Sequence, residues 1–219
     1  MDINKLELVI FDMDGLMLDT ERFYYNSVKE MCEKGKINVN MDAYRSVIGT
    51  SKSIDMNDFN RSCYSNKELD IMIRKQVESV RENFCLNGAP IKKGLLQLLH
   101  TLNKKGIRKA VATSTPFLIT ERLLKSVELE SEFEFIVTSE EVKKGKPYPD
   151  IFWLACKKAG VSYENSLVLE DSIPGALAAL TAGIPYIIVP DINYPTKGIV
   201  QAAVMVAESL SDVNSIFCF

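Results

Sequence analysis

The sequence is poor in histidine, and its cysteines form no paired motif. Its 219 residues include a single histidine, His100, which we interpret as a residue on a helix face. This argues against a Ser-His-Asp triad and against a metal site built from several histidines. The cysteines are far apart, odd in number and never arranged as C-x-x-C, which is typical of free thiols in a reducing cytosol. We therefore expect a cytoplasmic protein. The five cysteines are Cys32, Cys63, Cys85, Cys156 and Cys218.

The chain also lacks the features of secreted, membrane and nucleic-acid-binding proteins. Its first residues have neither the long apolar stretch nor the cleavage site of a secretory signal. No apolar run approaches the roughly 18 residues that a membrane-spanning helix needs. The net charge is −3 and the lysine pairs are scattered, so no basic stripe could follow a phosphate backbone. We expect neither a membrane nor a nucleic acid as a partner.

What the sequence does contain is a buried strand that ends in carboxylates. Residues 8–11, Leu-Val-Ile-Phe, form an apolar run too short for a helix and typical of a strand buried on both faces. Asp12 and Asp14 follow, and on an extended backbone their side chains would leave on the same side, roughly 6–7 Å apart. Two such anions repel unless a cation or a shared proton lies between them. An ordinary Asp-rich turn would look the same, so this stretch alone leaves both interpretations open.

The pattern of the remaining chain predicts two structural units. Between residues 20 and 87 every periodic segment is helical, whereas after residue 91 helices alternate with short apolar runs. Such alternation predicts parallel βαβ units with helices on both faces of the sheet. We predict an α/β fold, a doubly wound parallel sheet made by residues 1–19 and 88–219, with an inserted all-helical domain at 20–87. The further strands are expected at 108–114, 133–138, 166–171, 185–190 and 203–207, and the helices between them at 93–105, 118–127, 149–159 and 175–182.

Three of the predicted strands end in polar residues, and the ends of parallel strands gather at one edge of a sheet. Several carboxylates at one edge require a cation, and hard oxygen ligands favour Mg²⁺. A lysine in the following loop, Lys146, could balance the charge of a transferring phosphoryl group. An ordinary solvated loop lysine remains an equal alternative. The strand-end residues are Asp12, Asp14, Thr113, Ser114, Glu170 and Asp171.

These elements together resemble the haloacid dehalogenase superfamily of phosphotransferases. The closest likeness is to the group with a helical cap after the first strand, which holds β-phosphoglucomutase and many small phosphatases. The resemblance covers almost the whole chain in the right order and implies a Rossmann-like core. Its elements are Asp12-Met-Asp14-Gly15 with Asp19-Thr20, Val111-Ala-Thr113-Ser114, Lys146-Pro147, and Glu170-Asp171-Ser172 with Gly175.

The resemblance also implies a role for each of these residues. Asp12 would be the nucleophile that forms an aspartyl-phosphate, and Asp14 the general acid and then the general base. Mg²⁺ would be bound by Asp12, the backbone carbonyl of Asp14 and Asp171, with Glu170 as a ligand or beside the ligands. Thr113 and the N–H of Ser114 would hold phosphoryl oxygens. Lys146 would balance charge. Family members of this group more often have serine at the Thr113 position, but the hydroxyl is preserved.

The helical insert should select the substrate. By the same resemblance, Lys52 would contact a second anionic group, although a surface lysine is an equal alternative. Tyr24 stands where sugar-phosphate mutases usually have a histidine, which weakens the mutase interpretation.

We expect a Mg²⁺-dependent phosphatase of a small phosphorylated metabolite, a sugar or nucleoside phosphate. The alternative is a β-phosphoglucomutase-type phosphomutase. A binding module without turnover is a third hypothesis, but it should have lost Asp12 or Asp14. Dehalogenation is disfavoured because dehalogenases of the superfamily lack the second aspartate. We expect a monomer whose partner is a small phosphate monoester.

Overall fold

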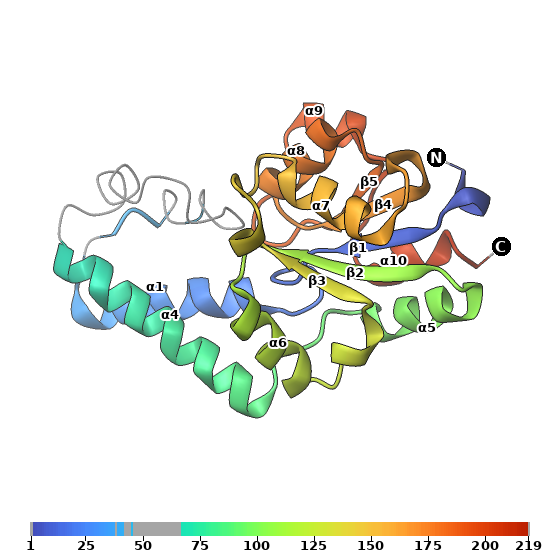
Figure 1. The fold of residues 1–219 in the computed structure, drawn as a ribbon. Coiled ribbons are helices and arrows are strands. Elements are labelled where there is room, and N and C mark those ends of the chain that lie inside the picture. The colour runs from blue at the N-terminus through green and yellow to red at the C-terminus, as the bar shows by residue number, and fades with distance from the viewer. Residues whose placement is uncertain (1, 38, 42–44, 46–66, 219) are drawn as a thin grey trace.

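The computed structural model describes residues 2–37, 39–41, 45 and 67–218, and a six-stranded parallel sheet forms its centre (Figure 1). The strands are β1 (Leu8–Phe11), β2 (Arg108–Thr113), β3 (Phe135–Thr138), β4 (Ser166–Glu170), β5 (Tyr186–Ile188) and β6 (Met205–Val206). Their order across the sheet is β3-β2-β1-β4-β5-β6. Strands β2 and β3 are therefore added on one side of β1, and strands β4, β5 and β6 on its other side. The boundary between β1 and β4 is the switch point, where open α/β sheets bind their ligands.

The helices cover both faces of the sheet, as predicted for a doubly wound fold (Figure 1). Helices α5, α6 and α10 lie on one face, and α7, α8 and α9 on the other. Their bounds are α5 (Leu95–Lys105), α6 (Phe117–Ser126), α7 (Asp150–Ala159), α8 (Ile173–Ala182), α9 (Lys197–Ala202) and α10 (Leu210–Ser215). Short 3-10 turns are found at Ile3–Lys5, Glu130–Glu132, Ser139–Glu141 and Tyr163–Asn165.

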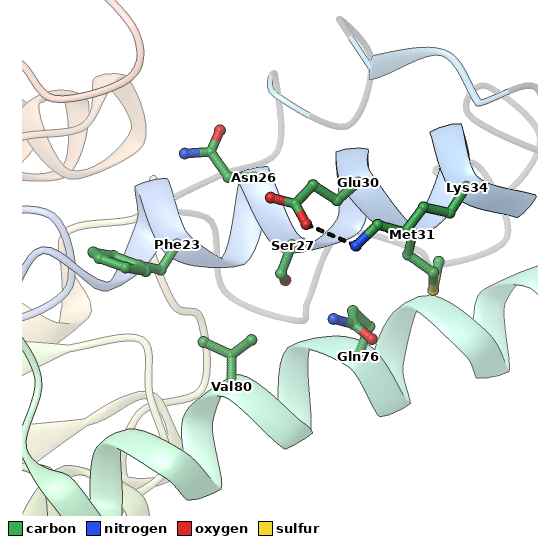
Figure 2. A pocket seen from close by; sticks show the side chains of 8 residues that line it. All are labelled: Phe23, Asn26, Ser27, Glu30, Met31, Lys34, Gln76 and Val80. Atoms are coloured by element: carbon green, nitrogen blue, oxygen red, sulfur yellow. Dashed lines mark hydrogen bonds and ion pairs between the residues drawn. The ribbon is translucent and has the colours of Figure 1, made fainter.

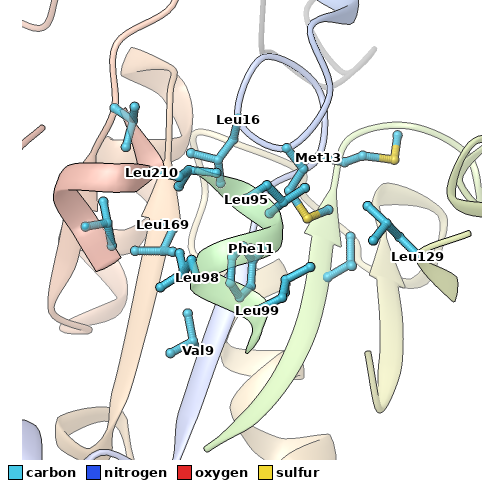
Figure 3. Close-up of a cluster of buried hydrophobic side chains, with 14 of the residues drawn as sticks. Val9, Phe11, Met13, Leu16, Leu95, Leu98, Leu99, Leu129, Leu169 and Leu210 are labelled. Atoms are coloured by element: carbon cyan, nitrogen blue, oxygen red, sulfur yellow. The ribbon is translucent and has the colours of Figure 1, made fainter. Parts of the chain in front are cut away.

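Strand β1 is buried on both faces because all four of its side chains are apolar. Val9 and Phe11 pack with the leucines of α5 in one cluster, which Figure 3 shows. Leu8 and Ile10 point to the opposite face and pack with α7 and α8. This alternation follows the two-residue period of a strand. An uninterrupted apolar run is therefore what a central parallel strand requires.

Two helices, α1 (Thr20–Gly35) and α4 (Lys67–Asn87), lie side by side and project away from the sheet (Figure 1). Buried side chains from both helices hold them together, and the Phe23 and Phe84 rings meet edge to face at 5.4 Å. The segments leading into and out of this pair also contact each other: the N–H of Asp19 donates to the carbonyl of Pro90 at 2.8 Å. The predicted division into residues 1–19 with 88–219 and residues 20–87 falls at these segments and stays a prediction.

Some predicted bounds were wrong. Only Met205 and Val206 of the run 203–207 pair as a strand. Edge strand β6 is this short because its neighbour β5 has only three residues. Helices α9 and α10 were not predicted. In the described part of the chain, no helix has the length and apolar character to cross a membrane.

Candidate active site

Asp12 lies directly after β1, at the switch point of the sheet. Its N–H donates to the carbonyl of Leu169 on β4 at 3.0 Å, which fixes it where β1 and β4 end. Its buried carboxylate accepts a hydrogen bond from the Nζ of Lys146. The predicted nucleophile and the predicted lysine therefore meet, although they are 134 positions apart in the sequence.

Lys146 is not a solvated lysine, because only 1% of it is exposed. Besides Asp12, its ammonium donates to Oε1 of Glu170 at 2.5 Å and to the carbonyl of Ala112 at 3.0 Å. It also lies 5.3 Å from the centre of the Phe152 ring. The lysine thus joins the ends of three strands, β1, β2 and β4.

The pKa values of Asp12 and Lys146 are both raised, but for different reasons. Burial raises the pKa of Asp12 to about 8; the Lys146 charge opposes this shift, and the Glu170 charge adds to it. Burial alone would lower the pKa of Lys146, but the charges of Asp12 and Glu170 outweigh it and raise that pKa. Lys146 therefore keeps its positive charge across the physiological pH range.

Glu170 is held at the beginning of α8 by four donors. Its Oε1 accepts from Lys146, and its Oε2 accepts from the N–H groups of Asp171 and Ser172 and from the Ser172 hydroxyl, at 2.9 to 3.0 Å. Gly175 makes room for this side chain, since a Cβ at that position would lie 1.8 Å from Oε1 of Glu170. Both carboxylate oxygens are therefore fixed, and the whole residue is buried.

Asp12, Glu170 and Asp171 form a buried group that we name the carboxylate cluster. One oxygen from each lies within 4.8 Å of the others. Burial raises the pKa of Asp171 well above its usual value, and the charges of Glu170 and Asp12 raise it further. Three hard oxygen donors fit Mg²⁺, and Lys146 offsets only part of their charge. Mg²⁺ and its predicted ligands Asp12, Asp14, Glu170 and Asp171 stay predictions.

The carboxylate of Asp14 lies outside the carboxylate cluster. Its Oδ1 accepts from the hydroxyl of Thr20 at 2.6 Å, and its Oδ2 accepts from the hydroxyl of Thr115 at 2.7 Å. Gly15, with a φ of +83°, turns the chain directly after it. The predicted metal contact of Asp14 was its backbone carbonyl, which leaves the side chain available for proton transfer. Sequence reasoning missed Thr115, although a run of three hydroxyl residues, 113–115, was visible.

Thr113 and Ser114 follow β2, the strand beside β1. Thr113 is buried, and its hydroxyl accepts from the N–H of Thr115 at 3.1 Å. The hydroxyl of Ser114 is buried and has no hydrogen-bond partner, so it can still donate. These contacts do not test the predicted roles of the two residues in holding phosphoryl oxygens.

Helix α1 brings two further polar groups to this region. Tyr24 is buried, and the guanidinium of Arg81 on α4 lies 5.6 Å from its ring centre. Burial and the nearby Asp14 charge raise the pKa of Tyr24. Glu21 was not predicted as a site residue, yet burial and the charges of Asp14, Asp12 and Asp191 raise its pKa to about 8. Lys52, the other predicted substrate contact, lies outside the described residues.

A groove of about 530 Å³ runs between α1 and α4, and Figure 2 shows its lining. None of the predicted site residues contributes to it, and Glu30 and Lys34, both on α1, pair along one of its walls at 3.2 Å. The predicted site residues lie instead at the sheet edge. The lining residues are Phe23, Asn26, Ser27, Glu30, Met31, Lys34, Gln76 and Val80.

Comparison with known proteins shows the family to which the chain belongs. Residues 9–189 match the family of haloacid dehalogenase-like hydrolases. The chain therefore belongs to this family, and within it to the β-phosphoglucomutase-like group of phosphatases. It is a phosphoric monoester hydrolase.

Individual relatives are similar over most of the chain. A Thermotoga maritima protein named phosphorylated carbohydrates phosphatase is 30% identical over 179 residues, which cover 82% of each chain. A Drosophila melanogaster protein named probable pseudouridine-5′-phosphatase is 31% identical over 197 residues, covering 86% of this chain and 84% of the other. The crystal structure of a hydrolase from Pseudomonas syringae has a TM-score of 0.77 at 26% identity, with 95% and 96% of the two chains covered.

Proposed function

We propose that this chain is a Mg²⁺-dependent phosphatase that hydrolyses a small phosphorylated metabolite, a sugar or nucleoside phosphate, through an aspartyl-phosphate at Asp12. The observation that carries the proposal is the position of Asp12, which belongs both to the carboxylate cluster and to the ion pair with Lys146. The names of the two relatives, one for phosphorylated carbohydrates and one for a nucleoside phosphate, indicate the substrate class.

The proposed reaction has two steps. An oxygen of Asp12 attacks phosphorus, a new P–O bond forms on the carboxylate, and the bond to the leaving alcohol breaks. Asp14 gives its proton to that leaving oxygen. Asp14 then takes a proton from the water that attacks the aspartyl-phosphate, which releases inorganic phosphate and restores Asp12.

The surrounding residues would hold the phosphoryl group. Asp12, the Asp14 carbonyl, Asp171 and Glu170 would bind Mg²⁺, which would supply positive charge to the phosphoryl oxygens. The Ser114 N–H and the Thr113 hydroxyl would donate to those oxygens, and Lys146 would balance the charge that develops on them. Tyr24 and Lys52 would contact the leaving group.

The test is phosphate release from a panel of hexose phosphates, pentose phosphates and nucleoside 5′-phosphates with Mg²⁺. Asp12→Asn should abolish turnover. Asp14→Asn keeps oxygen and nitrogen atoms where Thr20 and Thr115 bind but cannot donate an acidic proton, so kcat should fall roughly 10²–10⁴-fold. Wild-type turnover by Asp12→Asn would show that the nucleophile is assigned wrongly.

A second measurement separates the two roles. p-Nitrophenyl phosphate has a leaving group that needs little protonation, so Asp14→Asn should form the aspartyl-phosphate and hydrolyse it slowly. Intact-protein mass spectrometry should then detect one added phosphoryl group in Asp14→Asn and none in Asp12→Asn. In the panel, an isomerised sugar phosphate without phosphate release would instead identify the phosphomutase alternative.

A further inference from the structure

Asp191 is a buried carboxylate that the proposed reaction does not use. It lies three residues after β5, the strand next to β4, and only 1% of its side chain is exposed. Its Oδ1 accepts from Nε of Arg22 at 2.5 Å and from Nζ of Lys92 at 2.8 Å. Its Oδ2 is buried and has no hydrogen-bond partner. A buried acceptor that no protein donor reaches is costly unless a water or an ion satisfies it.

The free oxygen of Asp191 lies close to the carboxylate cluster. The position of Gly15 relates the two groups: a Cβ built on Gly15 would lie 2.2 Å from Oδ2 of Asp171 and 3.4 Å from Oδ2 of Asp191. Oxygens of both carboxylates therefore lie beside Gly15. Since β4 and β5 are neighbours in the sheet, their carboxyl ends bring Asp171 and Asp191 to the same edge.

The charges around Asp191 suit an anion that is not itself a metal ligand. Arg22 and Lys92 both bind Oδ1, and together they offset the cost of burying the carboxylate. Among the described residues, the group with metal-ligand spacing contains Asp12, Glu170 and Asp171 and does not include Asp191. Mg²⁺ normally retains several waters, and those waters need acceptors beyond the metal.

We propose that Oδ2 of Asp191 accepts a hydrogen bond from a water of the bound Mg²⁺, which makes Asp191 a positioning residue of the cation site. This inference rests on the Mg²⁺ dependence of the proposed function. Residues beside metal ligands orient the ligands and waters, and their loss typically costs 10–100-fold in metal affinity. Because Arg22 belongs to α1, the same carboxylate also joins the cation site to the helical pair.

The experiment is calorimetric titration of the metal-free full chain with MgCl₂ for the wild type and Asp191→Asn. The amide oxygen should stay with Arg22 and Lys92, which turns the NH₂ group toward the cation site. A donor there cannot accept from a metal-bound water, so Mg²⁺ should bind about 10-fold or more weakly. The rise in melting temperature on adding Mg²⁺ should shrink accordingly.

The matched control is Asp19→Asn. Asp19 lies in the same ion cluster, 3.3 Å from Nζ of Lys92 and 3.8 Å from Nε of Arg22, but its side chain is 28% exposed, and it is not a member of the carboxylate cluster. Both variants lose one negative charge. We expect Asp19→Asn to keep Mg²⁺ affinity within about twofold of the wild type, because it leaves every acceptor of the cation site in place.

The outcomes separate the inference from the proposed function. If the wild type binds Mg²⁺ and Asp191→Asn binds it equally well, or if Asp19→Asn is weakened as much, the role of Asp191 is overturned and the phosphatase proposal stands. If the wild type binds no Mg²⁺, both fail. Should Asp191→Asn not fold, Asp191→Ser is the second variant. Its shorter side chain removes the Oδ2 acceptor, so the same loss of affinity is expected.

Discussion

Replacing Lys146 with methionine would remove the cation from between Asp12 and Glu170 while keeping a side chain of similar length. Loss of one partner from a buried ion pair costs about 3–5 kcal/mol, because the remaining charge stays buried. Lys146 contacts two carboxylates, both buried, so we expect a loss near the upper end, about 5 kcal/mol. For a chain of this size that corresponds to a melting temperature lower by roughly 10–20 °C.

Lys109→Met is the matched control for this variant. Lys109 is also a buried lysine and pairs with Glu132 at 3.0 Å, but Glu132 is 31% exposed. Water can therefore replace the lost cation, and we expect a cost of about 1 kcal/mol. Both variants would be unfolded with urea in the presence of EDTA, so that no divalent ion contributes.

The cost of Lys146→Met should also depend on pH. Burial raises the pKa of Asp12 to about 8, and loss of the opposing Lys146 charge would raise it further. A carboxyl group with a higher pKa in the folded state favours folding below its unfolded pKa, and this contribution is lost as the pH rises through the folded pKa. The destabilisation should therefore be smaller at pH 5 than at pH 9. Equal costs for the two lysine variants, or a cost independent of pH, would refute this account of the site.

Two further predictions follow from the same geometry. Because the pKa values of Asp12 and Asp171 are raised, Mg²⁺ must displace protons when it binds. The Mg²⁺ affinity should therefore rise from pH 6 to pH 9, and calorimetry in buffers with different ionisation enthalpies should show proton release near pH 7. Binding that does not depend on pH would contradict this prediction. Gly175→Ala should destabilise the fold by about 2–3 kcal/mol in urea unfolding, because the added methyl group would overlap Glu170. Gly198→Ala, which meets nothing within 4 Å, should be neutral, and equal effects of the two substitutions would show that the Glu170 environment is not tight.

The sequence predicted the sheet well because a central parallel strand has an unmistakable composition. Leu8–Phe11 is apolar throughout and therefore readable as buried on both faces. Helix α10 was missed because six residues are too short for a periodic signal. A capping box of Ser209 and Asp212 marks its start, but its position depends on packing against α5, where a Cβ on Gly94 would lie 2.1 Å from the N of Ser211.

The candidate site was predictable only where chemistry follows directly from a strand end. Asp12, Glu170 and Asp171 could be grouped because parallel strands end at one edge. The burial of Lys146 could not be predicted, since it depends on the path of a loop between two distant strands. Glu21 and Asp191 belong to no motif that sequence reasoning recognised. Their significance comes from burial and from the charges around them, which only the folded chain reveals.

The charges at the sheet edge explain why protons and a divalent cation should compete there. The carboxylate cluster carries three negative charges when ionised, and Lys146 contributes one positive charge, which leaves two. One Mg²⁺ would balance that difference. Without Mg²⁺, burial raises the pKa of Asp12 to about 8. The buried carboxyl groups therefore take up protons, which reduce the negative charge. Asp191 adds a further negative charge that raises the pKa of Asp171, although Arg22 and Lys92 beside its Oδ1 offset part of that charge. In the proposed reaction, Lys146 would hold Asp12 in place, and Asp12 would become fully ionised once the cation replaced its proton.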